Sequence, residues 1–246
     1  MYTYRQLGRN GQLGNQLWQI ASTLGAARRH GDVAGFPDWR YRPYFCVPDE
    51  LFPDLSESAR GVTHDGGWDF LQDLGHLDGV EDTVRHYFRP RPAVWKRLAT
   101  RFADLLALEH KTSLHVRRTD YLLHPGIFVQ PSLDYYREAM SLTEGPYLVF
   151  SDDLDWCRRH LPGDCIFMEH NRNFEDLFLM AACDEHIIAN STFSWWGAWL
   201  SGRQTVCPRQ WFVESFIPGP TPFLQPSWTL LDVTSVDAVG AQPVNA

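Results

Sequence analysis

Residues 113–121 read SLHVRRTDY, and this stretch decides how the rest of the chain can be interpreted. Leu114 and Val116 alternate with polar residues, which is the period-two pattern of a β-strand, and the alternation ends where the stretch becomes fully polar. Arg117 and Arg118 therefore follow the end of a strand. Ligands of open α/β sheets bind beyond the carboxyl ends of the strands, where a guanidinium group suits phosphate oxygens. Taken alone, the two arginines are explained equally well by a surface ion pair.

The sequence after this strand alternates between strands and helices. The apolar run PYLVF is typical of a strand buried on both faces, and three later runs have strand character. Strands that alternate with helices predict a parallel, doubly wound sheet, so residues 110 to about 210 are expected to form one Rossmann-like lobe of an α/β fold. The predicted strands are 113–118, 146–150, 165–169, 186–189 and 204–207, with helices between them.

Capping residues mark the ends of these helices. Ser132 is placed to cap one helix, and Ser151 to cap the acidic helix start DDLDW. Asn173 and Asp176 can form a capping arrangement for the helix FEDLFLMAAC. Gly202 provides the stop for the short helix SWWGAWL. Its three tryptophans are best explained as packing residues, with a sugar platform as the alternative.

The N-terminal segment GQLGNQLWQIASTLGAARRHG, residues 11–31, has a different signature. Gly11 and Gly14 lie between a predicted strand at 2–7 and an amphipathic helix. Strand, glycine turn and helix is a layout that lets backbone N–H groups approach a ligand, but such turns also form for packing alone. Asn15, at the helix start, can cap the helix or reach a substrate.

Residues 35–100 are rich in Pro, Trp, Tyr and charged residues, and their pattern predicts no definite elements. We therefore expect an N-terminal lobe over residues 1–108, a C-terminal lobe over 109–233, and a flexible tail over 234–246.

Composition excludes several classes of protein. The net charge of −8, from 22 basic and 30 acidic residues, and basic runs no longer than two argue against a nucleic-acid binder. Five widely spaced cysteines favour reduced thiols, and neither Cys nor His shows metal-ligand spacing. The sequence has no apolar signal core and no transmembrane-length run, so we expect a soluble cytoplasmic protein. In that setting the glycosylation sequon NST at 190–192 is a coincidence.

Four blocks follow one another along the chain: GQLGNQLWQIA at 11–21, HVRRTDY at 115–121, FSDDLDWCRRHL at 150–161 and HIIANSTFSWWGAWL at 186–200. In this order they resemble the α1,2-fucosyltransferases of glycosyltransferase family 11 and, more distantly, the α1,6- and protein O-fucosyltransferases. The resemblance implies a GT-B type fold, with two Rossmann-like lobes and a cleft between them. It also implies transfer of fucose from GDP-fucose to a glycan hydroxyl, with inversion. The expected acceptor is a glycan, for which linkage to lipid and linkage to protein are both open. The enzyme would be free in the cytoplasm or peripheral to a membrane that carries the acceptor.

The arginine block carries the main role that the resemblance implies. Arg117 matches the arginine that contacts the donor β-phosphate, and Arg118 the neighbour that shapes the same pocket. His115 and Asp120 complete the pattern His-x-Arg-Arg-x-Asp. Asp120 would orient an arginine or the acceptor, or serve as the catalytic base, whereas His115 is equally well explained as a hydrogen-bonded core residue.

The other blocks supply further donor contacts by resemblance. Asp152 and Asp153 lie where relatives read the guanine edge, although capping of the following helix would also explain them. Ser191, Thr192 and Phe193 lie where relatives place phosphate-binding donors and a ring near the base or sugar.

In the N-terminal lobe, Gly14 and Asn15 belong to the block that faces both substrates, so Arg117, Asp120 and Asn15 form the expected catalytic set. Residues 77–88 are the nearest stretch to an acceptor segment of relatives, and the segment YLLHPG at 121–126 lacks the glutamate that α1,6 relatives use as a base. The acceptor is therefore left open. Two alternatives to a fucosyltransferase remain. One is a transferase for another sugar nucleotide, and the other is an inactive protein that binds a glycan or a nucleotide.

No metal or other cofactor is expected. The sequence DLD at 153–155 resembles the Asp-x-Asp signature of metal-dependent glycosyltransferases. In the first turn of a helix, however, Asp153 and Asp155 project about 200° apart and could not readily share one ion.

Overall fold

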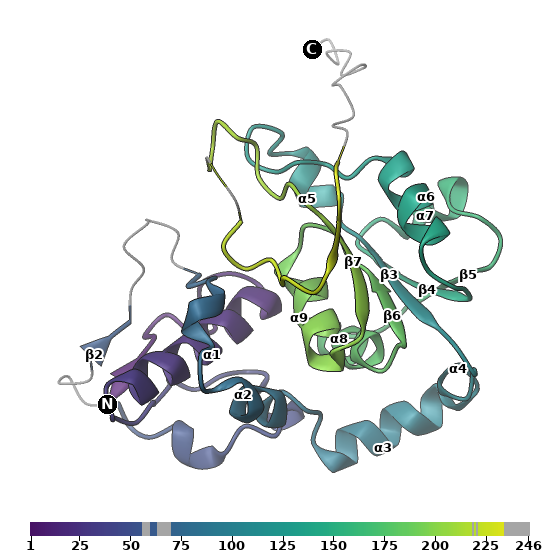
Figure 1. The fold of residues 1–246 in the computed structure, drawn as a ribbon. Coiled ribbons are helices and arrows are strands. Elements are labelled where there is room, and N and C mark those ends of the chain that lie inside the picture. The colour runs from purple at the N-terminus through teal and green to yellow at the C-terminus, as the bar shows by residue number, and fades with distance from the viewer. Residues whose placement is uncertain (56–59, 63–69, 218, 220, 234–246) are drawn as a thin grey trace, which may run out of the picture.

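The computed structural model describes residues 1–55, 60–62, 70–217, 219 and 221–233. Its largest element is a six-stranded sheet of order β5-β4-β3-β6-β7-β8 in which every neighbouring pair is parallel (Figure 1). The predicted parallel sheet is therefore confirmed, and the sequence pattern missed only its edge strand β8. The strands are β3 (Thr112–Val116), β4 (Tyr147–Ser151), β5 (Cys165–Phe167), β6 (Glu185–Ile187), β7 (Gln204–Pro208) and β8 (Thr229–Leu231).

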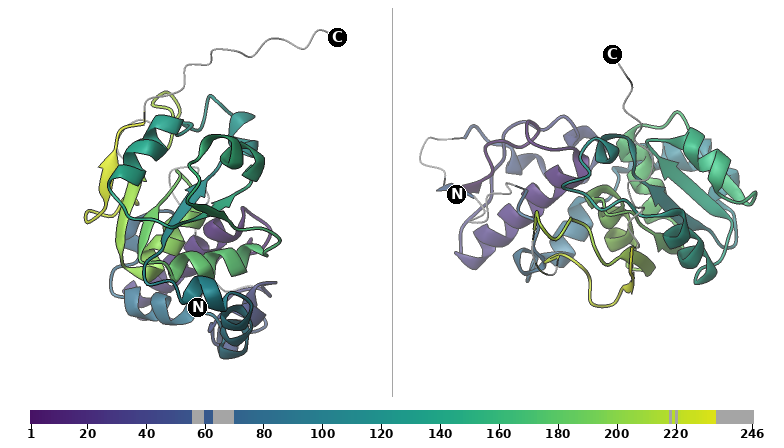
Figure 2. Two further views of the ribbon diagram at one scale, coloured as in Figure 1. Left: turned by 90° about the vertical axis from the view of Figure 1, so that its right-hand side faces the viewer. Right: turned by 90° about the horizontal axis from the view of Figure 1, so that it is seen from above.

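Helices cover both faces of this sheet (Figure 2). Helices α6 (Leu133–Ser141) and α7 (Leu154–His160) lie on the face to which Leu114 and Val116 point. Helices α8 (Asn173–Ala181) and α9 (Thr192–Ser201) lie on the opposite face, toward which His115 is directed through its contact with Ser194. The period-two alternation of β3 therefore places the polar side chain of His115 between the sheet and α9.

The helix caps agree with the sequence in part. Ser132 accepts a hydrogen bond from the backbone N–H of Tyr135 at the start of α6, as predicted. Gly202 ends α9 in the left-handed conformation, with φ 67°, also as predicted. The prediction for Ser151 was wrong because β4 extends through that residue, and the side chain of Asp153 caps α7 instead.

The predicted cap of α8 was also wrong. The helix begins at Asn173, and the carboxylate of Glu175 accepts a hydrogen bond from the backbone N–H of Arg172 at 2.8 Å. Asp176 takes no part in this cap, because its carboxylate accepts a hydrogen bond from the side chain of Asn171.

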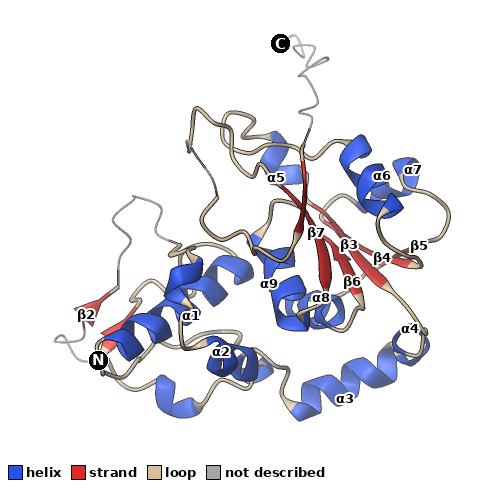
Figure 3. Ribbon diagram, in the orientation of Figure 1, coloured by secondary structure: helices blue, strands red, loops and turns tan. Residues whose placement is uncertain are grey.

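The N-terminal part consists mainly of helices and loops (Figure 3). The strand expected at 2–7 is reduced to β1, which pairs in parallel with β2 in a two-stranded sheet, the only sheet among the described residues before β3. The strands are β1 (Tyr2–Thr3) and β2 (Arg60–Gly61); the helices are α1 (Leu13–Arg29), α2 (Glu81–Tyr87), α3 (Pro92–Arg101) and α4 (Ala103–Leu106), with 3₁₀ turns at Arg42–Tyr44, Asp49–Leu51 and Leu74–His76. A further short helix, α5 (Thr119–Leu122), follows β3.

Helix α1 packs directly on α9, so the two parts of the chain share one hydrophobic core. The ring of Trp18 lies 4.5 Å from that of Trp195 and 5.1 Å from that of Trp196, measured between centroids. The indole N–H of Trp196 donates to the backbone carbonyl of Gly14 at 2.9 Å. Trp195, Trp196 and Trp199 are buried, which confirms their predicted packing role.

The five cysteines are all free thiols. No helix in the described part of the chain is long and apolar enough to cross a membrane. The tail predicted to be flexible, residues 234–246, lies outside the described residues.

Candidate functional site

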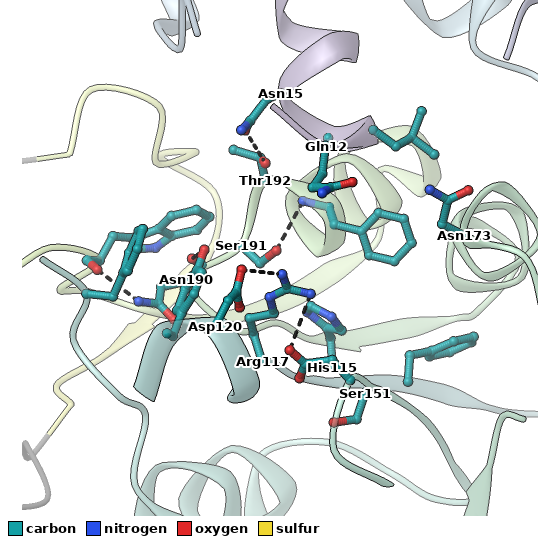
Figure 4. A pocket seen from close by; sticks show the side chains of 18 of the residues that line it. Gln12, Asn15, His115, Arg117, Asp120, Ser151, Asn173, Asn190, Ser191 and Thr192 are labelled. Carbon is teal, nitrogen blue, oxygen red and sulfur yellow. Dashed lines mark hydrogen bonds and ion pairs between the residues drawn. The ribbon is translucent and has the colours of Figure 1, made fainter. Parts of the chain in front are cut away.

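A cavity of about 550 Å³ lies where the carboxyl ends of β3 and β4 meet the first turns of α1 and α9 (Figure 4). This is the position at which open α/β sheets bind their ligands. Its wall includes nine of the eleven residues expected to bind or react: Gly14, Asn15, His115, Arg117, Asp120, Asp152, Ser191, Thr192 and Phe193. Arg118 and Asp153 do not line it.

Arg117 follows the last residue of β3 and lines the cavity. One guanidinium nitrogen lies 2.6 Å from the Asp120 carboxylate, and the other lies 3.4 Å from that of Asp152. Burial lowers the pKa of Arg117, but the hydrogen bond to Asp120 and the charges of both carboxylates outweigh it, so the pKa is raised. This arginine is therefore ion-paired and also reaches the cavity, and its contact with a phosphate stays a prediction.

Arg118 turns away from the cavity. Its Nε lies 3.3 Å from the Asp153 carboxylate, and its guanidinium lies over the Trp156 ring, 4.2 Å from the centroid. Asp153 in turn caps α7 by accepting a hydrogen bond from the backbone N–H of Trp156 at 3.0 Å. The pair thus fixes the start of α7 against the end of β3.

Asp152 holds the chain in position just after Arg117. Its carboxylate accepts hydrogen bonds from the backbone N–H groups of Arg118, at 2.9 Å, and Thr119, at 3.2 Å. The Thr119 hydroxyl donates to the same carboxylate. These bonds, together with the contact to Arg117, engage both carboxylate oxygens in contacts within the protein.

His115 is buried, and its Nδ1 lies 2.9 Å from the hydroxyl oxygen of Ser194 on α9. Burial and the nearby charge of Arg117 lower its pKa to about 3, so the imidazole is neutral at physiological pH. It is therefore a hydrogen-bonded core residue that also lines the cavity, and its contact with a ligand stays a prediction.

Two helix N-termini open on the same cavity. The first turn of α1 lines it through Leu13, Gly14 and Asn15, and the N-cap residue Gln12 makes no side-chain cap. The first turn of α9 lines it through Thr192 and its neighbours. The N-terminus of a helix carries unsatisfied N–H groups and a partial positive charge, which favour anions.

A polar bridge joins these two helices. The Oδ1 of Asn15 accepts hydrogen bonds from the Thr192 hydroxyl, at 2.8 Å, and from the Gln72 amide, at 3.0 Å. Because the carbonyl end of Asn15 is held on both sides, the other end of its amide is oriented as a donor.

Asp176 is a cavity residue that the sequence analysis assigned to a helix cap. Burial raises the pKa of this carboxyl to about 7, although the hydrogen bond from Asn171, at 2.8 Å, acts against the rise. It lies in the first turn of α8, and no local pattern in the sequence marks it as a cavity residue.

Aromatic side chains complete the wall. Tyr121 and Phe128 stack face to face with centroids 3.9 Å apart, and both line the cavity. Asn190 is buried and donates to the backbone carbonyls of Val129 and Trp211, so the sequon at this position is not accessible. In the described residues, no group of three or more His, Cys, Asp or Glu side chains could hold a metal ion.

Two solved structures resemble this fold. NodZ, an α1,6-fucosyltransferase from Bradyrhizobium co-crystallised with GDP, superposes with a TM-score of 0.50 at 14% identity, covering 80% of this chain and 89% of NodZ. POFUT1 in complex with GDP gives a TM-score of 0.54 at 13% identity, covering 84% of this chain and 98% of POFUT1. At these identities the likeness shows the shared fold, a mixed α/β architecture around a parallel sheet.

Sequence comparison identifies the family. An α1,2-colitosyltransferase of Escherichia coli is 34% identical over 146 residues, covering 50% of this chain and 49% of that protein. The O-antigen biosynthesis glycosyltransferase WbnK of Escherichia coli is 40% identical over 118 residues, covering 41% and 39%. These matches thus span about half or less of either bacterial relative.

A primate relative matches over more of its length. Galactoside α-(1,2)-fucosyltransferase 1 of Aotus azarae is 28% identical over 286 aligned positions, covering 91% of this chain and 76% of that protein. The family model for glycosyl transferase family 11 matches residues 81–228, which include the cavity residues contributed by β3, β4, α8 and α9. The chain belongs to glycosyl transferase family 11.

Proposed function

We propose that this protein transfers fucose from GDP-fucose to a galactoside hydroxyl in an α1,2 linkage, with inversion and without a metal ion. The observation that carries the proposal is the convergence on one cavity of the Arg117 guanidinium and the first turns of α1 and α9. Three sources of positive potential at the end of a parallel sheet suit a nucleoside diphosphate. Family relatives named as α1,2-fucosyltransferases support the choice of sugar and linkage.

The finer description of the fold is part of this proposal. We propose a GT-B type arrangement in which residues 109–233 bind the nucleotide and residues 1–108 bind the acceptor across the cavity. Support comes from the position of α1, whose first turn closes the cavity opposite the sheet.

For the guanine base we propose Asp176 as the main contact in place of Asp152 or Asp153. The latter two carboxylates are engaged by Arg117, Arg118 and nearby backbone N–H groups. Asp176 carries one side-chain hydrogen bond, from Asn171, and lines the cavity. An ionised carboxylate there could accept the two N–H groups of a guanine edge.

The reaction places different demands on the two ends of the donor. Cleavage of the sugar–phosphate bond builds positive charge on the sugar and negative charge on the departing GDP, so donors prepositioned at the diphosphate lower the barrier. Arg117 and the N–H groups around Thr192 supply that stabilisation. The Asn15 amide is oriented to donate a hydrogen bond at the reacting face.

Asp120 is the proposed proton acceptor for the attacking hydroxyl. Its Oδ2 is bonded to Arg117, which holds the carboxylate in place. Its side chain is half exposed at 50%, so an acceptor sugar can reach it from solvent. For inversion, its other oxygen, Oδ1, would face the side of the sugar away from the departing diphosphate and take the proton as the new glycosidic bond forms.

A second candidate is transfer of a different sugar from a nucleotide donor. One relative is named as an α1,2-colitosyltransferase, so the family includes a protein whose name specifies a different sugar. This candidate keeps the same diphosphate and base contacts, so it differs only in the sugar subsite.

The test is a comparison of nucleotides. GDP should raise the melting temperature far more than UDP or CMP at equal concentration, because a ligand that binds only the folded state stabilises it by mass action. Labelled GDP-fucose with an array of glycan acceptors should then give labelled galactosides and free GDP. Equal melting shifts for GDP and UDP would remove the proposal, and GDP binding without any transfer would indicate an inactive binding protein.

A further inference from the structure

A second cavity, of about 440 Å³, lies in the N-terminal part and has no role in the function proposed above. Three arginines line it, Arg40, Arg42 and Arg91, together with the carboxylates Asp38 and Asp49. The whole chain carries a net charge of −8, so three guanidinium groups around one cavity are a local excess of positive charge. Such groups are suited to carboxylate and phosphate oxygens.

Two of these arginines are held by one carboxylate. Asp49 Oδ1 lies 2.9 Å from Arg42 and 3.3 Å from Arg91. The hydrogen bond and charge of Arg42 lower the pKa of Asp49, so this carboxylate stays ionised. Arg91 also donates to the backbone carbonyl of Phe45 at 2.9 Å. This pair of arginines therefore forms the frame of the cavity.

Arg40 has a different environment. It is exposed, and in the described residues no carboxylate lies within ion-pair distance of its guanidinium. Its side chain donates to the Tyr41 hydroxyl at 2.9 Å, and its guanidinium lies over the Tyr41 ring, 4.7 Å from the centroid. The group is thus oriented by contact with a neutral ring, and a ligand anion would complete its pairing.

Tyr41 connects this cavity to the Arg117 cavity. Its hydroxyl also accepts a hydrogen bond from the side chain of Asn173, at 2.6 Å, and Asn173 lines the Arg117 cavity. Trp39, which lines the second cavity, donates to Gln16 on α1 at 2.8 Å. One phenol hydroxyl therefore contacts a wall residue of each cavity, so the two cavities lie on either side of the buried Tyr41.

We propose that the cavity around Arg40 binds an anionic group of the acceptor glycan, several atoms away from the hydroxyl that reacts. The proposal rests on the glycosyltransferase function proposed above and specifies the acceptor as acidic. The anion is either the carboxylate of a uronic acid in the glycan or a diphosphate at its reducing end. Both present paired oxygens to a guanidinium.

The test compares three acceptors with the same reactive galactose. One is a neutral galactosyl disaccharide, the second carries glucuronic acid, and the third carries a reducing-end diphosphate. Arg40→Gln should raise KM for one anionic acceptor about tenfold, the loss of one charge-assisted contact, and leave KM for the neutral acceptor unchanged. The acceptor that is affected identifies the source of the anion.

Arg137→Gln is the matched control, because Arg137 is an exposed arginine of α6 that lines neither cavity. It removes the same charge and should change no KM value. If Arg40→Gln alters all three acceptors equally, or none of them, the proposal is wrong.

A binding measurement separates this proposal from that of the donor. Inorganic diphosphate would also enter the proposed donor site, so both probes are titrated into Arg117→Ala protein without a sugar nucleotide. Glucuronic acid or inorganic diphosphate should bind this variant more tightly than the double variant that also carries Arg40→Gln. Failure of GDP to bind the wild-type protein would overturn the proposed function alone. Identical isotherms for Arg117→Ala and the double variant with both probes would overturn the acidic subsite alone.

Discussion

The two sides of the Arg117 cavity are held by different forces. On the sheet side, six strands are joined by continuous backbone hydrogen bonds, and the cavity residues follow strand ends. On the α1 side, the described strands are two residues long, and position depends on side chains, such as Trp18 against Trp195 and Arg85 over Trp199 at 3.9 Å. Backbone pairing fixes the sheet side, whereas the α1 side can change with its side chains. That division suits a donor site of fixed geometry and an acceptor site that can vary.

Replacement of Arg117, which lies on the sheet side, should have the largest effect on the reaction rate. Arg117→Ala should lower the turnover of GDP-fucose by about 10² to 10³, the usual cost of losing one electrostatic donor at a developing charge. Arg117→Lys should be nearly as damaging, since it keeps the charge but loses the planar fork. The turnover of both variants is measured as the steady-state rate of GDP release.

The melting temperature provides the control for this experiment. Arg117 is 27% exposed, and the Asp152 carboxylate keeps its bonds to Arg118 and Thr119 when the arginine is removed. The melting temperature should therefore change little. Unimpaired turnover in Arg117→Ala would mean that the arginine is only an ion-pair partner, and would remove the main support for the proposed function.

Gly14→Ala should have the second largest effect, because it disturbs the contact between the two sides. A Cβ at this position would lie 2.6 Å from the backbone nitrogen of Phe193 and 2.6 Å from the Thr192 hydroxyl. Helices α1 and α9 would have to separate, so we expect a loss of about 1–3 kcal/mol in unfolding free energy, together with weaker GDP binding.

Gly163→Ala is the control, since nothing lies within 4 Å of a Cβ there. Denaturant titration compares the two variants. A Gly14→Ala protein as stable as Gly163→Ala would show that the first turns of α1 and α9 are not in fixed contact.

The same division explains what the sequence could predict. On the sheet side, runs such as 146–150 are apolar because helices cover both faces of the sheet. Their strand character can therefore be recognised from the run itself. The described residues between 35 and 100 show no such period, because their core positions are set by contacts with elements far away in sequence, including α8 and α9. Phe45 against Phe178 is one such contact.

For the site, the sequence predicted residues that lie beside strand ends and missed those that act through distant contacts. Arg117 and His115 could be placed because they lie at the end of an alternating strand. Gln72 and Asp176 could not, because the partner that brings each into the site is known only from the fold. The sequence analysis placed Arg118 near the donor, yet its side chain turns toward Trp156. Spacing along the sequence does not determine which of these two directions the side chain takes.

A smaller effect is expected from a change of pH on the affinity for GDP. The pKa of Asp176 is raised to about 7 from an ordinary value of 3.8, chiefly by burial. If its ionised form binds guanine, GDP affinity should rise about tenfold between pH 6 and pH 8, as the ionised fraction rises. Calorimetric titration at a series of pH values measures this slope.

Asp176→Asn serves as the comparison variant, since the GDP phosphate also titrates near this range and affects both proteins alike. The variant should bind GDP more weakly and lose the additional slope. In the protein without GDP, the pKa of Asp176 is higher in the folded state than in the unfolded state, so stability falls as pH rises from about 4 to 7. At pH 8 the melting temperature of Asp176→Asn should therefore be higher than that of wild type. Identical pH slopes for the two proteins would exclude Asp176 as the guanine contact.

The smallest expected effect is that of metal removal, which tests whether arginine and helix N-termini alone supply the positive charge on the sheet side. Asp153 is bonded to the backbone N–H of Trp156 and paired with Arg118, whereas Asp155 is 83% exposed and lies 3.4 Å from Arg158. The two carboxylates of the DLD sequence therefore have separate partners, and binding of one ion by both would require breaking the cap of α7. Transfer rates measured in EDTA should equal those measured with added Mg²⁺ or Mn²⁺, in wild type and in Asp155→Asn alike. A rate that falls in EDTA and is restored by either ion would show that a cation shares the role proposed for Arg117, and would move the diphosphate toward the DLD segment.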